Sequence, residues 1–187
     1  MKKTTTILIG VLVIILLIAG YFISSYNGIV AAEEDVDAQF AKVETQLQRR
    51  FDLIPNLVSA TQGYMQHEKD VFTAIADARS KLAGATTVND KVEASNELEG
   101  ALSRLLMVVE NYPELKADTQ FTALMDELAG TENRIATERN RYNESVQTFN
   151  AKIRKFPTSF IASIMGVEKR DYFEAQAGAD QAPSVNF

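Results

Sequence analysis

The sequence contains no cysteine and only one histidine. Without cysteine there are no disulfides, thiol nucleophiles or thiolate metal sites, so the fold must rely on packing alone. His67 lacks the second histidine of a zinc-protease helix, and a di-iron bundle needs two Glu-x-x-His units. The Gly-x-Ser-x-Gly and Ser-x-x-Lys motifs and the phosphate loop are also absent. We therefore expect no metal, no cofactor and no enzymatic activity.

Glycine, proline and tryptophan are scarce, with 9, 4 and 0 residues. This composition disfavours turn-rich β architecture and favours long helices. Basic residues are also outnumbered: all 25 acidic residues follow position 30, so the remainder of the chain has a net charge of about −8. An acidic surface argues against nucleic acid as a partner and against lying flat on anionic lipid.

A long uncharged run dominates the first thirty residues. Residues 7–23 are all apolar or small and span about 26 Å as a helix, close to the ~30 Å hydrocarbon core of a bilayer. We predict a membrane anchor that contacts lipid through Ile7, Leu12, Leu17 and Ile23. Lys2 and Lys3 place the start of the chain in the cytoplasm by the positive-inside rule, so the rest is exported. The alternative is a cleavable secretory signal, whose apolar core is usually shorter and ends at small residues.

Three regions are predicted along the chain. Residues 1–30 form the basic N-terminus and the membrane anchor, residues 31–174 an exported helical domain, and residues 175–187 a disordered tail that is poor in apolar side chains. About 157 residues remain beyond the anchor, which is the usual size of a single domain.

Apolar residues recur at helical spacing through the exported domain. One stripe begins with Val36, Val43, Leu47 and Ile54; further helices are predicted for residues 88–111, 118–155 and 159–166. Pro55 predicts a kink or break near residues 52–55. The predicted class is therefore all-α: a single transmembrane helix followed by an antiparallel up-down bundle of three long helices, or four if the first divides near Gly63.

Polar residues stand beside several core positions of these helices. They form either an ordinary solvated face or a buried hydrogen-bonded network that fixes helix register. We expect Arg49 or Arg50 to pair with an acidic residue of another helix, Glu110 or Glu132 first. The complete candidate network is Gln48, Arg49, Arg50, Asn56, Glu110, Asn111, Glu132, Asn133, Arg134 and Asn143.

Several longer segments form distinctive sequence motifs. Residues 26–30 read YNGIV, residues 43–58 VETQLQRRFDLIPNLV, residues 109–117 VENYPELKA and residues 130–136 GTENRIA. These segments, with LSRLL at 102–106, resemble the signature of the LemA family of bacterial membrane-anchored helical proteins. The resemblance covers nearly the whole chain except the tail. Phe51 departs from the pattern, since the family more often has a small residue there.

The resemblance implies an N-terminal anchor in the bacterial inner membrane, a short cytoplasmic N-terminus and a helical domain in the periplasm or outside the cell. It brings no catalytic residues. Two functions stay open: a non-enzymatic scaffold that self-associates at the membrane or binds other envelope proteins, a protease among them, and a receptor that binds a peptide or small ligand and signals to an envelope protease or stress system. The scaffold prediction rests on the lack of a catalytic constellation, on long helices with much lateral surface and on a tether that holds copies in one plane. For self-association we expect partial exposure of Phe72, Met107, Met125 and residues 160–165.

Overall fold

The chain is all-helical in the part that the structure describes. The computed structural model describes residues 2–173, in which there is no strand. The helices are α1 (Lys2–Gln62), α2 (Lys69–Gly84), α3 (Val88–Val109), α4 (Pro113–Lys116), α5 (Thr119–Arg154) and α6 (Thr158–Met165). The predicted all-α class is confirmed, and only the single turn α4 was not predicted.

Contacts divide the chain into two compact units, to which α1 and α5 both contribute. The anchor unit comprises Met1–Gln39 and Tyr142–Arg170, and the bundle unit comprises Phe40–Arg141 and Asp171–Phe187. The predicted domain limits at residues 30 and 174 stay predictions. The predicted tail, residues 175–187, lies outside the described residues.

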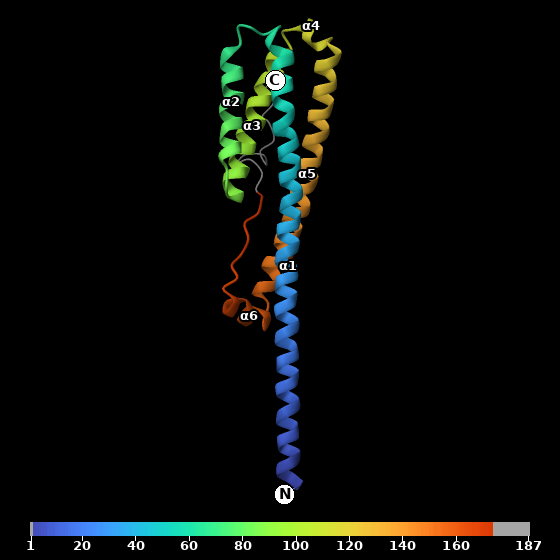
Figure 1. The fold of residues 1–187 in the computed structure, drawn as a ribbon, viewed down its shortest axis with the longest axis vertical. Helices are drawn as coiled ribbons and strands as arrows, with labels where there is room; N and C mark the ends of the chain where they lie inside the picture. Colours follow the sequence, from blue (N-terminus) through green and yellow to red (C-terminus); the bar gives the residue numbers. More distant parts are fainter. Residues whose placement is uncertain (1, 174–187) are drawn as a thin grey trace, which may run out of the picture. The chain divides into compact units, whose positions relative to one another are not determined.

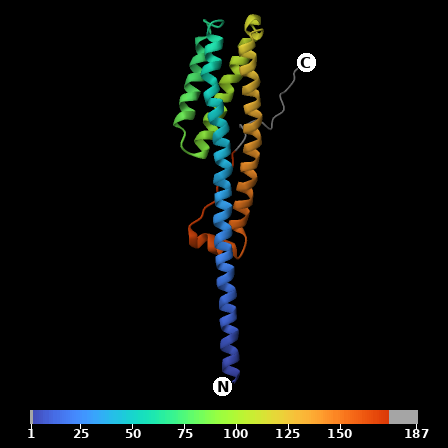
Figure 2. The same cartoon turned by 45° about the vertical axis from the view of Figure 1, so that its right-hand side comes forward.

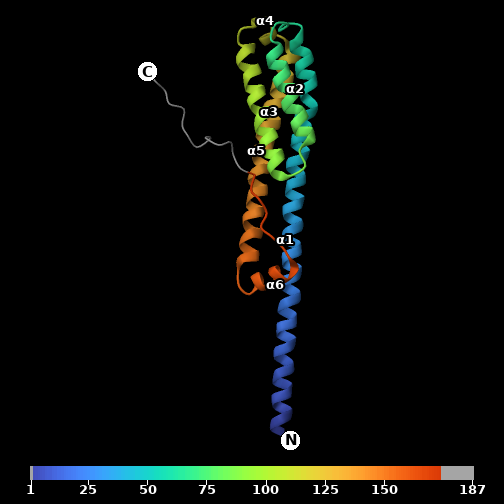
Figure 3. The ribbon, with the colours of Figure 1, turned by 90° about the vertical axis from the view of Figure 1, so that its left-hand side faces the viewer.

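The bundle unit packs four helices around one apolar core. The chain runs up and down through the second part of α1, α2, α3 and the first part of α5 (Figures 1 and 3). The core includes Ile54, Ile75, Leu98 and Leu128, one from each helix, and all four are at most 7% exposed. Of the two predicted bundles, the structure has the one of four helices, in which the first predicted helix divides near Gly63. Figure 2 shows α2 and α3 as a hairpin beside α1.

The first helix ends at Gln62 and is not broken at Pro55. Of the predicted kink or break, the break does not occur, because the residues around the proline are held in the core: Ile54 and Leu57 are 1% and 2% exposed. Their burial outweighs the loss of one backbone hydrogen bond. The kink stays a prediction. A turn closes the end of the helix: the carbonyl of Thr61 accepts the backbone N–H groups of Tyr64 and Met65, both at 3.0 Å.

Side-chain caps fix where α3 and α5 begin. Thr87 and Asp90 form a capping box at the start of α3, with both reciprocal hydrogen bonds at 3.1 Å. At the start of α5, Asp118 Oδ1 accepts the backbone N–H groups of Gln120 and Phe121, each at 2.9 Å. These caps satisfy donors that the first turn of a helix leaves unpaired.

The anchor unit combines the first part of α1, the last part of α5 and α6. The Lys152 ammonium of α5 donates to the backbone carbonyl of Gly28 in α1. Gly166 ends α6 in the left-handed conformation at φ 68°, which glycine adopts without steric cost. Beyond it, Arg170 exchanges two backbone hydrogen bonds with the Asn150 side chain, at 2.9 and 3.0 Å, and donates to Glu33 at 3.0 Å.

Candidate functional site

Arg50 lies at the centre of a buried polar cluster in the bundle unit. Its side chain is fully buried because Leu47 and Ile54, one turn away on either side, share the core-facing stripe of α1. Its Nη1 donates to Glu132 Oε2 of α5 at 2.7 Å. Its Nη2 donates to the Ser95 carbonyl of α3 at 3.3 Å and to the hydroxyl of the same serine. One guanidinium thus joins three helices.

Arg139 is a second cation on the same serine. Its Nη2 donates to Ser95 Oγ at 2.8 Å, and its guanidinium lies 4.4 Å from the centre of the Phe173 ring. Burial lowers the pKa of Arg139; Glu132 opposes this shift and Arg50 adds to it. Ser95 is itself fully buried. Its hydroxyl therefore serves as an acceptor between two arginines, which suits a structural junction.

The structure brings only part of the predicted network together. Arg50 and Glu132 meet in the cluster, whereas the neighbouring Arg49 pairs with Glu127 at 2.7 Å, both side chains being about half exposed. Glu110 pairs with Lys116 at 2.7 Å and not with an arginine of α1.

The other predicted network residues lie outside this cluster. Gln48 donates to Asp52, one turn later in α1, at 2.8 Å. Asn143 is half-buried and belongs to the anchor unit. Four further residues are exposed in the bundle unit: Asn56, Asn111, Asn133 and Arg134. Their assignment to a functional network stays a prediction.

Sequence reasoning missed Ser95, Arg139 and Phe173. The signal for the first two was periodicity: Ser95 stands three residues before the buried Leu98, and Arg139 stands four residues after the buried Ile135. Both are polar residues on apolar stripes. Phe173 gave no such signal because it follows the last helix and depends on the chain's return to the bundle.

The predicted anchor residues are all exposed on α1. Ile7, Leu12, Leu17 and Ile23 are between 56% and 69% exposed, in a run of apolar side chains that the rest of the described chain leaves uncovered. Within residues 2–173, α1 is the one helix long and apolar enough to cross a membrane, judged by length and composition. Such a surface suits lipid, because hydrocarbon solvates what water does not.

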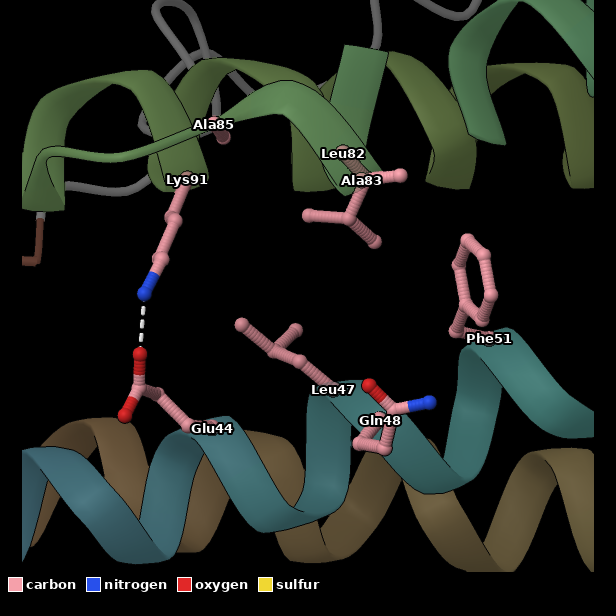
Figure 4. A pocket seen from close by; sticks show the side chains of 8 residues that line it. All are labelled: Glu44, Leu47, Gln48, Phe51, Leu82, Ala83, Ala85 and Lys91. Atoms are coloured by element: carbon pink, nitrogen blue, oxygen red, sulfur yellow. Dashed lines mark hydrogen bonds and ion pairs between the residues drawn. The ribbon is translucent and has the colours of Figure 1, made fainter. Parts of the chain in front are cut away.

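A pocket of about 340 Å³ opens between α1, the end of α2 and the start of α3. The side chains of Leu47 and Leu82 point into it, and Phe51 closes one end (Figure 4). At the other end, the Lys91 ammonium is paired with the Glu44 carboxylate. The pocket is an open cleft whose lining combines apolar side chains with one ion pair.

Phe51, the residue that departs from the LemA pattern, is held in place by a cation. The guanidinium carbon of Arg79 lies 4.0 Å from the centre of the Phe51 ring, within the range of a cation–π interaction. The described residues contain no group of three or more His, Asp or Glu side chains that could hold a metal ion. The chemistry that the pocket offers is binding through apolar contact and charge.

Comparison with known proteins supports the resemblance seen in the motifs. The model of the LemA family matches residues 39–187. "Magnetosome protein MamQ 2" of Paramagnetospirillum magneticum is 29% identical over 181 residues, covering 83% of this chain and 66% of the relative. "Magnetosome protein MamQ" of Magnetospirillum gryphiswaldense is 28% identical with the same coverage. The chain thus spans slightly less than two thirds of these relatives.

A more distant relative carries the family's own name. "Protein LemA" of Metamycoplasma hominis is 22% identical over 155 residues, covering 82% of this chain and 71% of the relative. Together with the apolar first part of α1, these matches indicate a membrane-associated protein.

Proposed function

The chain belongs to the LemA family, and we propose that it is a non-enzymatic scaffold of the bacterial envelope, anchored in the inner membrane by the first part of α1. In this proposal the N-terminus is cytoplasmic and the helical domain faces the periplasm or the cell exterior. Copies of the chain self-associate at the membrane and present helical surfaces to other envelope proteins.

The observation that carries the proposal is the continuity of α1. A single helix runs from Lys2 to Gln62, so no linker separates the apolar run from the residues that pack in the bundle core. An anchor of this kind confines copies to two dimensions and raises their effective concentration. Contacts too weak for assembly in solution then suffice.

Exposed apolar side chains of the bundle unit supply a contact surface. Met107 and Leu106 of α3 are 65% and 39% exposed. Phe72 and Met125 are half-buried against the core and contribute less than the sequence suggested. The buried Ser95, held by two arginines and out of reach of a substrate, supports a structural role for the polar cluster.

Cross-linking in native membranes tests the scaffold. The chain has no cysteine, so one introduced by Met107→Cys reports only contacts at that position. We expect a disulfide-linked dimer on oxidation, and a weaker one for Asn133→Cys, an exposed polar position of α5. The mass in mild detergent should be a multiple of 20.7 kDa and should depend on salt, because the acidic subunits repel one another.

A monomer at every salt concentration, together with the absence of cross-links from both cysteine variants, would refute self-association. The same purification identifies co-purifying chains, which the scaffold function predicts. A protein that is monomeric and has no chain bound to it would leave the receptor as the better explanation.

The pocket of Figure 4 specifically favours that second candidate, a receptor. Ala83 lines the pocket, and Ala76 is an exposed residue of the same helix that does not. Ala83→Trp should fill the pocket, and Ala76→Trp is its matched control. Native mass spectrometry of protein purified in lipid nanodiscs would show a bound ligand that the first variant loses and the second keeps. Identical spectra for the wild type and both variants would argue against the receptor.

A further inference from the structure

Three large apolar side chains around α6 are exposed on one side of the anchor unit. Phe160 and Ile164 of α6 stand four residues apart, on one face of the helix, and are 66% and 60% exposed; Phe156, just before the helix, is 87% exposed, and we call these three residues the α6 face. The opposite side of the helix carries Ile161 and Ala162, each 3% exposed. The helix α6 therefore has two apolar sides: one is packed on protein and the other is left uncovered.

Contacts within the anchor unit place α6 at one end of the apolar run of α1. The hydroxyls of Thr158 and Tyr21 lie 3.3 Å apart, and Lys152, shortly before α6, donates to the carbonyl of Gly28. Figures 1 and 3 both show α6 beside α1. Counted from Thr4, Tyr21 lies about 26 Å along the helix, near the far boundary of a hydrocarbon core about 30 Å thick.

We propose that α6 is an interfacial membrane helix whose α6 face inserts into the outer boundary of the bilayer next to the anchor. The proposal rests on the membrane anchoring described above. Aromatic and aliphatic side chains on one face of a short helix insert at the level of the headgroups and upper acyl chains. On α1 the same level carries Tyr21, the ring that interfacial belts favour, and it is 44% exposed.

Local charge fits this location although the chain as a whole is acidic. Residues 152–170 contain five basic residues and one acidic residue. Arg154, Lys155 and Lys169 are exposed, whereas Arg170 is paired with Glu33. Exposed cations beside an inserted apolar face bind anionic lipid headgroups. The overall charge argued against lying flat on such lipid, but the segment that approaches it has the opposite sign.

Lipid fits the α6 face better than a second copy of the chain does. The face adjoins the uncovered apolar surface of α1, which includes Leu17 and Ile23 at 69% and 60% exposure. A bilayer that solvates this surface is present wherever the chain is anchored, and covering the α6 face requires no further association. A second copy would have to displace that lipid.

Tryptophan fluorescence tests the proposal without background, because the chain contains no tryptophan. The probe is full-length protein in phosphatidylcholine vesicles that contain phosphatidylglycerol, with lipid brominated near the top of the acyl chain as a contact quencher. Single variants carry Phe160→Trp on the α6 face, Phe22→Trp in the anchor or Gln147→Trp at an exposed position of α5 in the same unit. We expect brominated lipid to quench the first two, and aqueous iodide to quench only the third.

Each outcome decides between specific alternatives. If Phe22→Trp is quenched by brominated lipid but Phe160→Trp by iodide, the anchor stands and the interfacial helix is refuted. If neither quencher reaches Phe160→Trp, protein covers the face, which also refutes the proposal and favours a second copy. If brominated lipid fails to quench Phe22→Trp, the anchoring itself is wrong. Phe160→Ser, in a chain that keeps Phe22→Trp, should leave the anchor's quenching unchanged.

Discussion

Replacing Arg50 tests whether the buried cluster stabilises the bundle unit. Arg50→Ala removes a fully buried guanidinium that bonds to Glu132 and Ser95 and leaves a void in its place. Large-to-small substitutions at buried positions cost about 2–5 kcal/mol. The carboxylate left behind adds little, because Glu132 is 37% exposed and water can solvate it. We expect a loss of about 3 kcal/mol.

The reverse substitution should cost at least as much, although Glu132 is the more exposed partner. Glu132→Gln leaves Arg50 buried without its counter-charge, and removing one partner of a buried pair costs about 3–5 kcal/mol. Ser95 and the nearby Arg139 offer no negative charge in compensation. The double variant Arg50→Met with Glu132→Gln should recover part of this loss, since Arg50 then leaves no buried charge without its partner.

Arg49 provides the matched control, one residue away on the same helix. Its pair with Glu127 has the same 2.7 Å distance but is 49% and 42% exposed, so Arg49→Ala should cost under about 1 kcal/mol. Urea unfolding of the full chain in mild detergent, followed by circular dichroism, gives all four values. Equal losses for Arg49→Ala and Arg50→Ala, both below about 1 kcal/mol, would refute the reasoning.

Three further outcomes are expected. The pKa of Asp90 lies below its ordinary 3.8 because of its hydrogen bonds with Thr87, so Asp90 stabilises the fold above pH 3.8 and this contribution is lost as the pH falls through the lowered pKa. The difference in Tm between the wild type and Asp90→Asn should therefore close in acid, and a difference independent of pH would contradict this. Gly100→Ala should raise stability by about 0.5–1 kcal/mol, since nothing lies within 4 Å, whereas Gly28→Ala should gain less because its Cβ would lie 3.0 Å from Lys152 Nζ; equal gains would contradict the close approach. Protease added to cells with an intact inner membrane should digest the helical domain, and full protection would reverse the topology.

The helical core was predictable because its apolar residues repeat regularly. Val43, Leu47 and Ile54 are each at most 5% exposed, as their spacing predicted. The break that Pro55 left open does not occur, because its local cost is visible in the sequence while the tertiary burial that outweighs it is not. The division near Gly63 was predicted only as an alternative, since the buried residues Leu57, Thr61 and Met65 keep helical spacing across the end of α1.

The candidate site was predictable only in part. Arg50 and Glu132 were among the predicted network residues, and the structure joins them. Arg49 and Arg50 were predicted together, although the spacing of Leu47 and Ile54 places Arg50 on the core-facing stripe and Arg49 about 100° away from it. The pocket was missed since its walls come from three segments whose lateral packing no single stripe specifies.

The partners of α1 in the anchor unit are synthesised long after α1 itself. Gly28 meets Lys152, and Glu33 meets Arg170, across 124 and 137 residues of sequence. At about 5–20 residues per second, the ribosome makes these partners roughly 6–27 seconds after α1 has emerged. Until then this part of α1 lacks the two partners that hold it in the anchor unit. A segment that leaves the ribosome early thus completes its packing late, and a chain cut short before Lys152 never completes it.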